Sequence, residues 1–292
     1  MRRKGLLFAL GSVCAAGLLV LCLIGVLRLV QRAEIKLPTR EVSLGKRHRD
    51  AVVDSLAVSP DSRRVAYVVW RGNKLWVVVD GAEGEEYGGI AGNPVFSPDS
   101  QRVVYGAQRG DKWLVVVNGL EEMEYEGIME GTLVFSPDSK RVGFGAQRGG
   151  KWSVVVNGVE GKEYDGIMKG TPVFNPDSQR VAYGAWRGDK WLVVVDGLEG
   201  KEYDGILKGS LVFSPDSQRV AYGAQRRNKW LAVAAGTEGN EYDGFLKGSR
   251  LVFDSPSQFH TLAFRGDKYL RVEAEIVTPA AEPSVPKMED RK

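Results

Sequence analysis

The sequence predicts an all-β protein that is built from repeated four-stranded antiparallel sheets. The motif Ser-Pro-Asp-Ser begins at residues 59, 97, 136 and 214, and Asn-Pro-Asp-Ser begins at 175, so one unit recurs every 38 or 39 residues. Within each unit, short runs rich in valine and aromatic residues alternate with turn residues. The valine runs are apolar on both faces of their strands, so each sheet needs a neighbour on either side.

The unit at 172–209 shows the expected elements most clearly. Four strands are expected, at the residues before its second proline and at 180–185, 191–195 and 202–206. Pro-Asp-Ser favours a tight turn after the first strand, because proline fixes φ and the aspartate side chain can bond the backbone ahead. Arg-Gly-Asp-Lys is expected to form the second turn. Asp-Gly or Asn-Gly, a strong hairpin signal, is expected to form the third.

Radial repetition of such sheets would bury both faces of each one, which predicts a six-bladed β-propeller over residues 50–277. The sixth unit lacks a counterpart of the fourth strand. Residues 40–45, just before the first unit, are expected to supply that strand and to close the ring. The tail at 278–292 is expected to be disordered.

The repeated core F-S-P-D-S-x-R-V-A-Y resembles the WD-like propeller repeat of TolB-type proteins. It occurs at 96–105, 135–144, 174–183 and 213–222, and the resemblance covers residues 50–275. It implies the propeller fold and, because TolB-type propellers are periplasmic, a place outside the cytoplasmic membrane. The units are nearly identical to one another, which leaves little room for one specialised catalytic blade.

The N-terminus is predicted to be a membrane anchor. Residues 1–4 form a basic tail, and 5–30 form the expected transmembrane helix, which is uncharged from 5 to 27 and long enough to span a bilayer. A cleavable signal peptide is the alternative, although its apolar region should be shorter. The linker at 31–49 contains six basic residues. Charge counting therefore favours a cytoplasmic propeller, whereas the resemblance favours a single-pass protein with a periplasmic one, and the orientation stays open.

The repeats offer few residues for catalysis or metal binding. The cysteines, Cys14 and Cys22, both lie in the apolar N-terminal segment, which excludes a disulfide framework or a cysteine zinc site in the repeats. His260 is the only histidine in the repeats and no G-x-S-x-G motif occurs, so a Ser-His-Asp triad is not expected. We expect a protein that is not an enzyme and that has no metal or cofactor. The recurring turn aspartates are expected to cap their turns: Asp99, Asp138, Asp177 and Asp216.

The tryptophans have two readings, a stacking platform for sugars or bases and a part of the core. Because they adjoin the valine runs, we expect them in the core between blades. Trp186 stands where three other units have glutamine, and it is a candidate for a singular surface aromatic. The recurring tryptophans are Trp76, Trp113, Trp152, Trp191 and Trp230.

Charge is distributed unevenly over the predicted turns. The turns between second and third strands contain thirteen basic residues and three acids, whereas the segments that begin at the third turns contain fourteen acids and two lysines. We therefore expect one basic and one acidic face, and a basic rim that could hold carboxylates or phosphates. The candidate partner-binding residues of this rim are Arg71, Arg109, Arg148, Arg187, Arg226, Arg265, Lys169, Lys208 and Lys247.

These observations favour a membrane-anchored, non-enzymatic propeller that acts as a protein-interaction scaffold or recognition module. The net charge of +3 is too small to indicate a nucleic-acid partner. Two alternatives remain: a periplasmic small-ligand or glycan-binding propeller that uses a central channel, and an enzyme that acts on polyanionic glycans. For the basic rim the plain alternative is solubility, because repeated loops multiply the charges that they carry.

Overall fold

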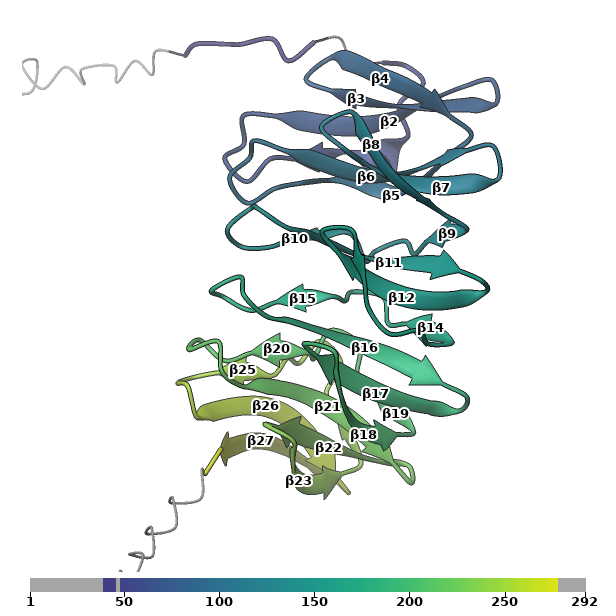
Figure 1. Cartoon of the computed structure of the whole chain (residues 1–292). Helices are drawn as coiled ribbons and strands as arrows, with labels where there is room; N and C mark the ends of the chain where they lie inside the picture. Colours follow the sequence, from purple (N-terminus) through teal and green to yellow (C-terminus); the bar gives the residue numbers. More distant parts are fainter. Residues whose placement is uncertain (1–38, 46–47, 278–292) are drawn as a thin grey trace, which may run out of the picture. The chain divides into compact units, whose positions relative to one another are not determined.

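The computed structural model describes residues 39–45 and 48–277 (Figure 1). The chain divides into two units, 1–43 and 44–292, and of the first unit only residues 39–43 are described. No helix of the described residues is long and apolar enough to cross a membrane. The predicted anchor at 5–30 and the predicted disordered tail at 278–292 lie outside the described residues, as do the basic tail at 1–4 and most of the linker.

The second unit contains six antiparallel sheets that follow one another along the chain. In the first five sheets the chain runs from an inner strand, which lacks a partner on its inner side, to an outer strand, and in the sixth the last described strand is β27. The inner strand of four sheets is interrupted, so that two short segments pair with the same second strand. This arrangement confirms the prediction of repeated antiparallel sheets.

The bounds of the strands are as follows. The first sheet contains β1 (Ala57–Val58), β2 (Val65–Arg71), β3 (Lys74–Val79) and β4 (Ala82–Tyr87), preceded by a 3₁₀ turn, η1 (Val53–Ser55). The second contains β5 (Gly89–Phe96), β6 (Val103–Arg109), β7 (Lys112–Val117) and β8 (Leu120–Tyr125). The third contains β9 (Gly127–Ile128), β10 (Val134–Phe135), β11 (Val142–Arg148), β12 (Lys151–Val156) and β13 (Val159–Glu160).

The fourth contains β14 (Gly166–Ile167), β15 (Val173–Phe174), β16 (Val181–Arg187), β17 (Lys190–Val195) and β18 (Leu198–Tyr203). The fifth contains β19 (Gly205–Ile206), β20 (Val212–Phe213), β21 (Val220–Arg226), β22 (Lys229–Ala234) and β23 (Thr237–Tyr242). The sixth contains β24 (Gly244–Phe245), β25 (Val252–Phe253), β26 (Gln258–Arg265) and β27 (Lys268–Glu275).

The fourth strand of each unit begins earlier than the sequence predicted. The expected strand at 202–206 is two elements, because β18 ends at Tyr203 and Gly205 and Ile206 form β19 of the next sheet. The hairpin turn explains the shift. Asp196 has φ of 51° and Gly197 of 79°, so two residues reverse the chain and the outer strand begins at once with Leu198.

Consecutive sheets pack face to face, as the valine runs predicted. Between the second and third sheets, Val104 and Val115 of one meet Phe144 and Val155 of the other in a cluster of buried residues. Similar clusters join each of the other neighbouring pairs. Three of the recurring tryptophans lie half-buried against these clusters, as expected for core residues: Trp113, Trp152 and Trp191.

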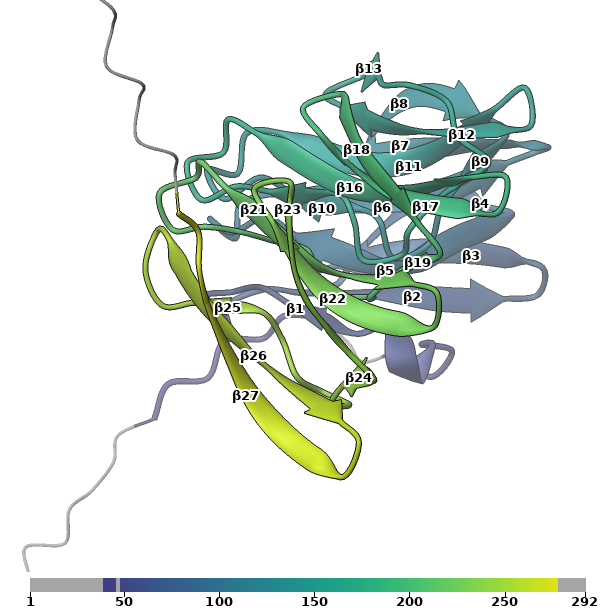
Figure 2. The same cartoon turned by 90° about the horizontal axis from the view of Figure 1, so that it is seen from below.

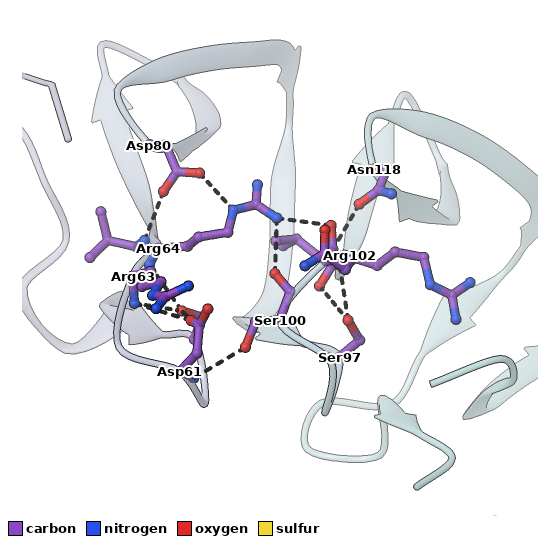
Figure 3. A network of polar contacts seen from close by, with 12 residues as sticks. Asp61, Arg63, Arg64, Asp80, Ser97, Ser100, Arg102 and Asn118 are labelled. Carbon is purple, nitrogen blue, oxygen red and sulfur yellow. Dashed lines mark hydrogen bonds and ion pairs between the residues drawn. The ribbon is translucent and has the colours of Figure 1, made fainter. Parts of the chain in front are cut away.

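The Pro-Asp-Ser turns link the first five sheets in sequence, and Figure 3 shows the link between the first and the second. Asp61 accepts hydrogen bonds from the Ser59 hydroxyl and the Arg63 amide, and its own amide donates to the Ser100 hydroxyl of the following sheet at 3.1 Å. Ser100 has φ of 63°, which the tight turn requires. The later turns repeat the link, from Asp99 to Ser139, from Asp138 to Ser178 and from Asp177 to Ser217.

The two ends of the series differ from its middle. Within the described residues the sixth sheet ends at β27, and residues 39–45 form no strand, so the predicted closing strand at 40–45 is not formed in this structure. Leu56, just before β1, and Val58 of the first sheet are 58% and 54% exposed, and Tyr269 on the outer face of the sixth sheet is 81% exposed. These two faces therefore do not pack against each other.

Candidate functional site

The predicted rim arginines end the second strand of every sheet. A two-residue turn joins each arginine to a lysine that begins the third strand, and the two are register partners, as in Arg109 and Lys112. We call the end of the sheets that carries these turns the turn face. Its six arginines are Arg71, Arg109, Arg148, Arg187, Arg226 and Arg265.

Five of these arginines are paired with a glutamate of the outer strand of the same sheet, twelve residues later in the chain. The Nη2 atom of Arg109 lies 2.5 Å from Glu121, and that of Arg187 lies 2.7 Å from Glu199. The other pairs are Arg71 with Glu83, Arg148 with Glu160 and Arg226 with Glu238, at 2.6, 3.0 and 2.8 Å. An anionic ligand at these guanidinium groups would have to compete with a carboxylate of the chain itself.

A tyrosine of the preceding sheet completes a three-residue joint, which we call the Tyr–Glu–Arg joint. Arg187 lies over the ring of Tyr164, with 5.4 Å between its Cζ atom and the ring centroid, and the Tyr164 hydroxyl donates to Glu199 at 3.0 Å. Tyr87 donates to Glu121 and Tyr203 to Glu238 in the same way. The joint therefore fixes neighbouring sheets to each other and has a structural role.

The pKa values follow from these contacts. The hydrogen bond from Arg187 lowers the pKa of Glu199 and raises that of Arg187 itself. Burial raises the pKa of Tyr164, and it raises that of Tyr222 to about 12. These groups keep their charge state at neutral pH, so none of them is tuned for proton transfer there.

The lysines of the turn face are largely paired as well. Lys151 lies 2.6 Å from Asp165, and Lys190 lies 2.7 Å from Asp204, while Lys229 bonds Asp243. These aspartates also accept a backbone amide from the turn of the next sheet, such as that of Gly188 on Asp165. Both kinds of bond lower the pKa of the Asp165 carboxyl, the lysine bond most.

The expected separation into a basic and an acidic face is not formed. The acidic segments that begin at the third turns become outer strands that run back toward the turn face. Glu86, near the end of β4, lies 3.5 Å from Lys74. Of the other rim candidates, Lys169 lies 3.8 Å from Glu130, while Lys208 and Lys247 form no salt bridge within the described part of the chain. Their role in binding stays a prediction.

Trp186 is not the free surface aromatic that the sequence suggested. It is half-buried, and its ring centroid lies 4.8 Å from that of Trp191. His260 bonds Asp254 at 2.7 Å and is half-buried. Among the described residues, no group of three or more histidine, cysteine, aspartate or glutamate side chains could hold a metal ion.

A row of exposed aliphatic side chains was not predicted from the sequence. The first residue of the outer strand is Leu120 in the second sheet, Val159 in the third and Leu198 in the fourth, and these are 74%, 72% and 77% exposed. Each is followed by the glutamate that pairs with the arginine of its sheet, and in the second and fourth sheets this glutamate also accepts the tyrosine bond of the joint. The aliphatic residue after each Asn-Gly or Asp-Gly pair was visible in the sequence, but its exposure depends on where the outer strand begins.

No family model matches the chain, and no curated protein matches it either. Solved structures that resemble it include TolB from Acinetobacter baumannii, with 18% identity, a TM-score of 0.37 and coverage of 65% of this chain. They also include Kluyveromyces lactis Hsv2, at 12% identity, a TM-score of 0.41 and coverage of 75% of this chain and 79% of the other. The β-propeller domain of the Trilobed protease from Pyrococcus furiosus has 12% identity, a TM-score of 0.41 and coverage of 77% and 83%.

The match spans 55% of the TolB chain. The resemblance to TolB-type and WD-like propellers that the sequence predicted is thus confirmed at the level of the fold. At these identities the likeness concerns the fold alone.

Proposed function

We propose that the protein is a non-enzymatic, propeller-type scaffold that binds another protein through its outer strands. The observation that carries this proposal is the row of Leu120, Val159 and Leu198, which we call the aliphatic row. Exposed aliphatic side chains at the same place on three consecutive sheets offer a repeated apolar surface that solubility does not require. Their glutamate neighbours suit a partner with aliphatic residues flanked by basic ones.

Two further features support a binding role for the outer strands. β8 and β18 each expose five of their six residues, and each pairs with a third strand on one side only. Closely packed sheets hold these edges in place, because the Tyr–Glu–Arg joints tie neighbouring sheets together. A rigid, repeated surface of this kind binds a partner without losing much conformational entropy.

An anionic partner at the basic rim is the weaker candidate. Its ligand would have to displace glutamates that lie 2.5 to 3.0 Å from Arg109, Arg148 and Arg187. A catalytic role is weaker still, because the ionisable residues of the turn face are held in structural pairs. Membrane anchoring through residues 5–30 and a periplasmic propeller are part of the proposal. A reporter that is active only outside the cytoplasm, fused after residue 277, tests that side.

The main test compares two triple variants in affinity purification from the native host. In the first, Leu120→Ser, Val159→Ser and Leu198→Ser remove the aliphatic row. The second variant is a control with changes in the same three sheets: Arg109→Gln, Arg148→Gln and Arg187→Gln remove charges of the turn face. We expect a protein that co-purifies with the wild type to be lost from the first variant and kept by the second. Loss from the second alone would move the binding site to the rim.

A further inference from the structure

The sixth sheet lacks an outer strand within the described part of the chain. β27 pairs with β26 along eight residues, and Figure 2 shows β27 as the last strand of its sheet. In each of the other five sheets the third strand pairs with an outer strand on its far side, as β7 does with β8 and β22 with β23. The outer edge of β27 is therefore the one third-strand edge of the described sheets that has no neighbour.

A hollow follows this edge. It has a volume of about 470 Å³ and lies between β27 and the outer part of the fifth sheet. Its apolar wall is formed by Ala232, Ala234, Tyr242, Phe259, Val272 and Ala274. Six consecutive residues, 272–277, line the hollow along β27 and just beyond it, which suits an extended chain lying beside this strand.

The Tyr–Glu–Arg joint between the fifth and sixth sheets is incomplete. Arg265 lies over the Tyr242 ring at 4.8 Å, as Arg187 lies over Tyr164. Its guanidinium donates to the backbone oxygen of Glu241 at 2.7 Å and forms no salt bridge within residues 39–45 and 48–277. Tyr242 is buried, and no hydrogen bond of its hydroxyl group is formed with another described residue. The glutamate that pairs with the arginine in the other five sheets comes from the outer strand, and no described residue supplies that strand here.

The register says where such a glutamate would lie. Arg265 pairs with Lys268 as Arg109 pairs with Lys112, so Val272 occupies the place of Val116. Val116 is the register partner of Glu121, the glutamate of the joint. A strand that added to β27 in the antiparallel sense would therefore bring its glutamate opposite Val272.

The next position distinguishes this site from the other sheets. Val117 is opposite Leu120 in the second sheet, but its counterpart on β27 is the exposed Glu273, which lies 3.0 Å from the exposed Arg271 of the same strand. The residue before the glutamate of an added strand would therefore lie opposite a carboxylate. Lysine or arginine fits that position, because opposite charges that face each other across two strands are favourable.

We propose that the edge of β27 and the adjoining hollow bind an extended segment of a partner protein as a fourth strand. The segment contains a basic residue followed by glutamate, and the glutamate completes the joint with Tyr242 and Arg265. Backbone hydrogen bonds to β27 supply affinity and the alternate side chains supply specificity. The inference rests on the proposal that the protein binds a partner protein, but it uses a different surface from the aliphatic row.

The test uses a fluorescent peptide with the sequence of residues 196–205 carrying Leu198→Lys, and the full-length protein. This peptide reproduces an outer strand of the chain and adds the basic residue that Glu273 favours. We expect saturable binding in fluorescence anisotropy, and a loss of about tenfold or more when Glu199→Gln is also made in the peptide, because a charged hydrogen bond is removed. Methylation of alternate backbone amides of the peptide should abolish binding.

Protein variants locate the site. Arg265→Gln should weaken binding about as much as Glu199→Gln in the peptide does, and the two changes together should weaken it little further, because they break the same contact. Arg250→Gln removes a charge from an exposed position of the sixth unit and should leave binding unchanged. The triple serine variant of the aliphatic row should also bind the peptide normally, so failure of one proposal is distinguishable from failure of the other.

Three results would overturn the inference: no binding to the wild type, binding that survives amide methylation, or binding that Arg265→Gln does not change. A fourth concerns the occupant. Hydrogen exchange of the protein without peptide would show this. If the backbone amides on the outer edge of β27 are already protected from exchange, a segment of the same chain or of a second copy fills the site. That outcome would exclude a partner protein there.

Discussion

Gly166→Ala should destabilise the protein through one aromatic contact. Gly166 on β14 is the register partner of Trp186 on β16, and a Cβ atom on Gly166 would lie 1.9 Å from Cη2 of that indole. The indole cannot move freely, because it lies against Trp191 at 4.8 Å between ring centroids. Alanine therefore forces Trp186 out of its place.

The magnitude follows from two effects of opposite sign. Overpacking costs about 1–3 kcal/mol and the loss of an aromatic pair about 0.5–1.5 kcal/mol. Removal of glycine recovers about 0.4–1 kcal/mol by restricting the unfolded chain. The free energy of unfolding should therefore fall by about 2–3 kcal/mol, which lowers Tm by about 4–12 °C for a unit of this size.

The repeat supplies matched controls for this change. Gly205 occupies the same place in the fifth sheet, but its Cβ would meet Oε1 of Gln225 at 3.2 Å, at the end of a flexible side chain. Gly205→Ala should therefore change Tm little, and Trp186→Gln combined with Gly166→Ala should restore most of the lost stability. The assay is thermal unfolding together with the near-ultraviolet circular dichroism of the tryptophan pair. A Gly166→Ala protein with the Tm and spectrum of the wild type would refute the reasoning.

Three further predictions concern stability. Tyr164→Phe removes the bond to Glu199 and should lower the free energy of unfolding in urea by about 1–3 kcal/mol. Tyr125→Phe should be neutral or stabilising, because the buried Tyr125 hydroxyl has no hydrogen-bond partner in the described structure. Equal losses of stability in the two variants would contradict this prediction. The serine bonds lower the pKa of Asp99, Asp138 and Asp216 from 3.8, so their stabilisation is present above about pH 4 and is lost as the pH falls through the lowered values. The urea concentration at the midpoint of unfolding should therefore decrease as the pH is lowered from 7 to 3. It should decrease less in a variant in which all three aspartates are changed to asparagine. An equal decrease in this variant would show that these carboxyls do not contribute. Ala235 has φ of 49° at a hairpin position where the other sheets have Asp or Asn. Because a positive φ is unfavourable for alanine and not for glycine, Ala235→Gly should raise the free energy of unfolding by about 1 kcal/mol. A decrease would show that the turn is not strained.

The repeat and its turns could be predicted because their signals are local. Proline, aspartate and glycine at fixed places determine the turns, and the Ser59–Asp61 and Asp196–Gly197 geometries are those that the residue types favour. The boundary between two sheets could not be predicted in the same way. Tyr203 and Gly205 are neighbours in an extended stretch, but one ends a sheet and the other begins the next.

The pairing of charges was hidden for a different reason. The numbers of basic and acidic residues in the turns can be counted in the sequence, but the pairing of these residues cannot. Arg109 and Glu121 are twelve residues apart. They meet because the third strand runs back between them and because the outer strand has a bulge opposite 114–116. The prediction of two charged faces treated each turn as separate from its strands. A prediction of charged surfaces in repeats therefore has to place the register first.

The sixth unit departs from the repeat on the face of its sheet that no other described sheet covers. The run Lys-Trp-Leu-Val-Val-Val of β17, in which three residues are buried, becomes Lys-Tyr-Leu-Arg-Val-Glu in β27, in which half-buried and exposed residues alternate from Leu270 onward. Leu270 and Val272 face the fifth sheet, while Arg271 and Glu273 face solvent. A seventh sheet stacked on that face would bury these charges at a prohibitive free energy. The outer face of the sixth sheet is thus polar, as the end units of repeat proteins require. Its edge at β27, beside Arg265 and Tyr242, still has backbone groups that are unpaired among the described residues and that can pair with a further strand. Association at this end of the protein should therefore proceed by adding a strand to the edge rather than by stacking a sheet on the face.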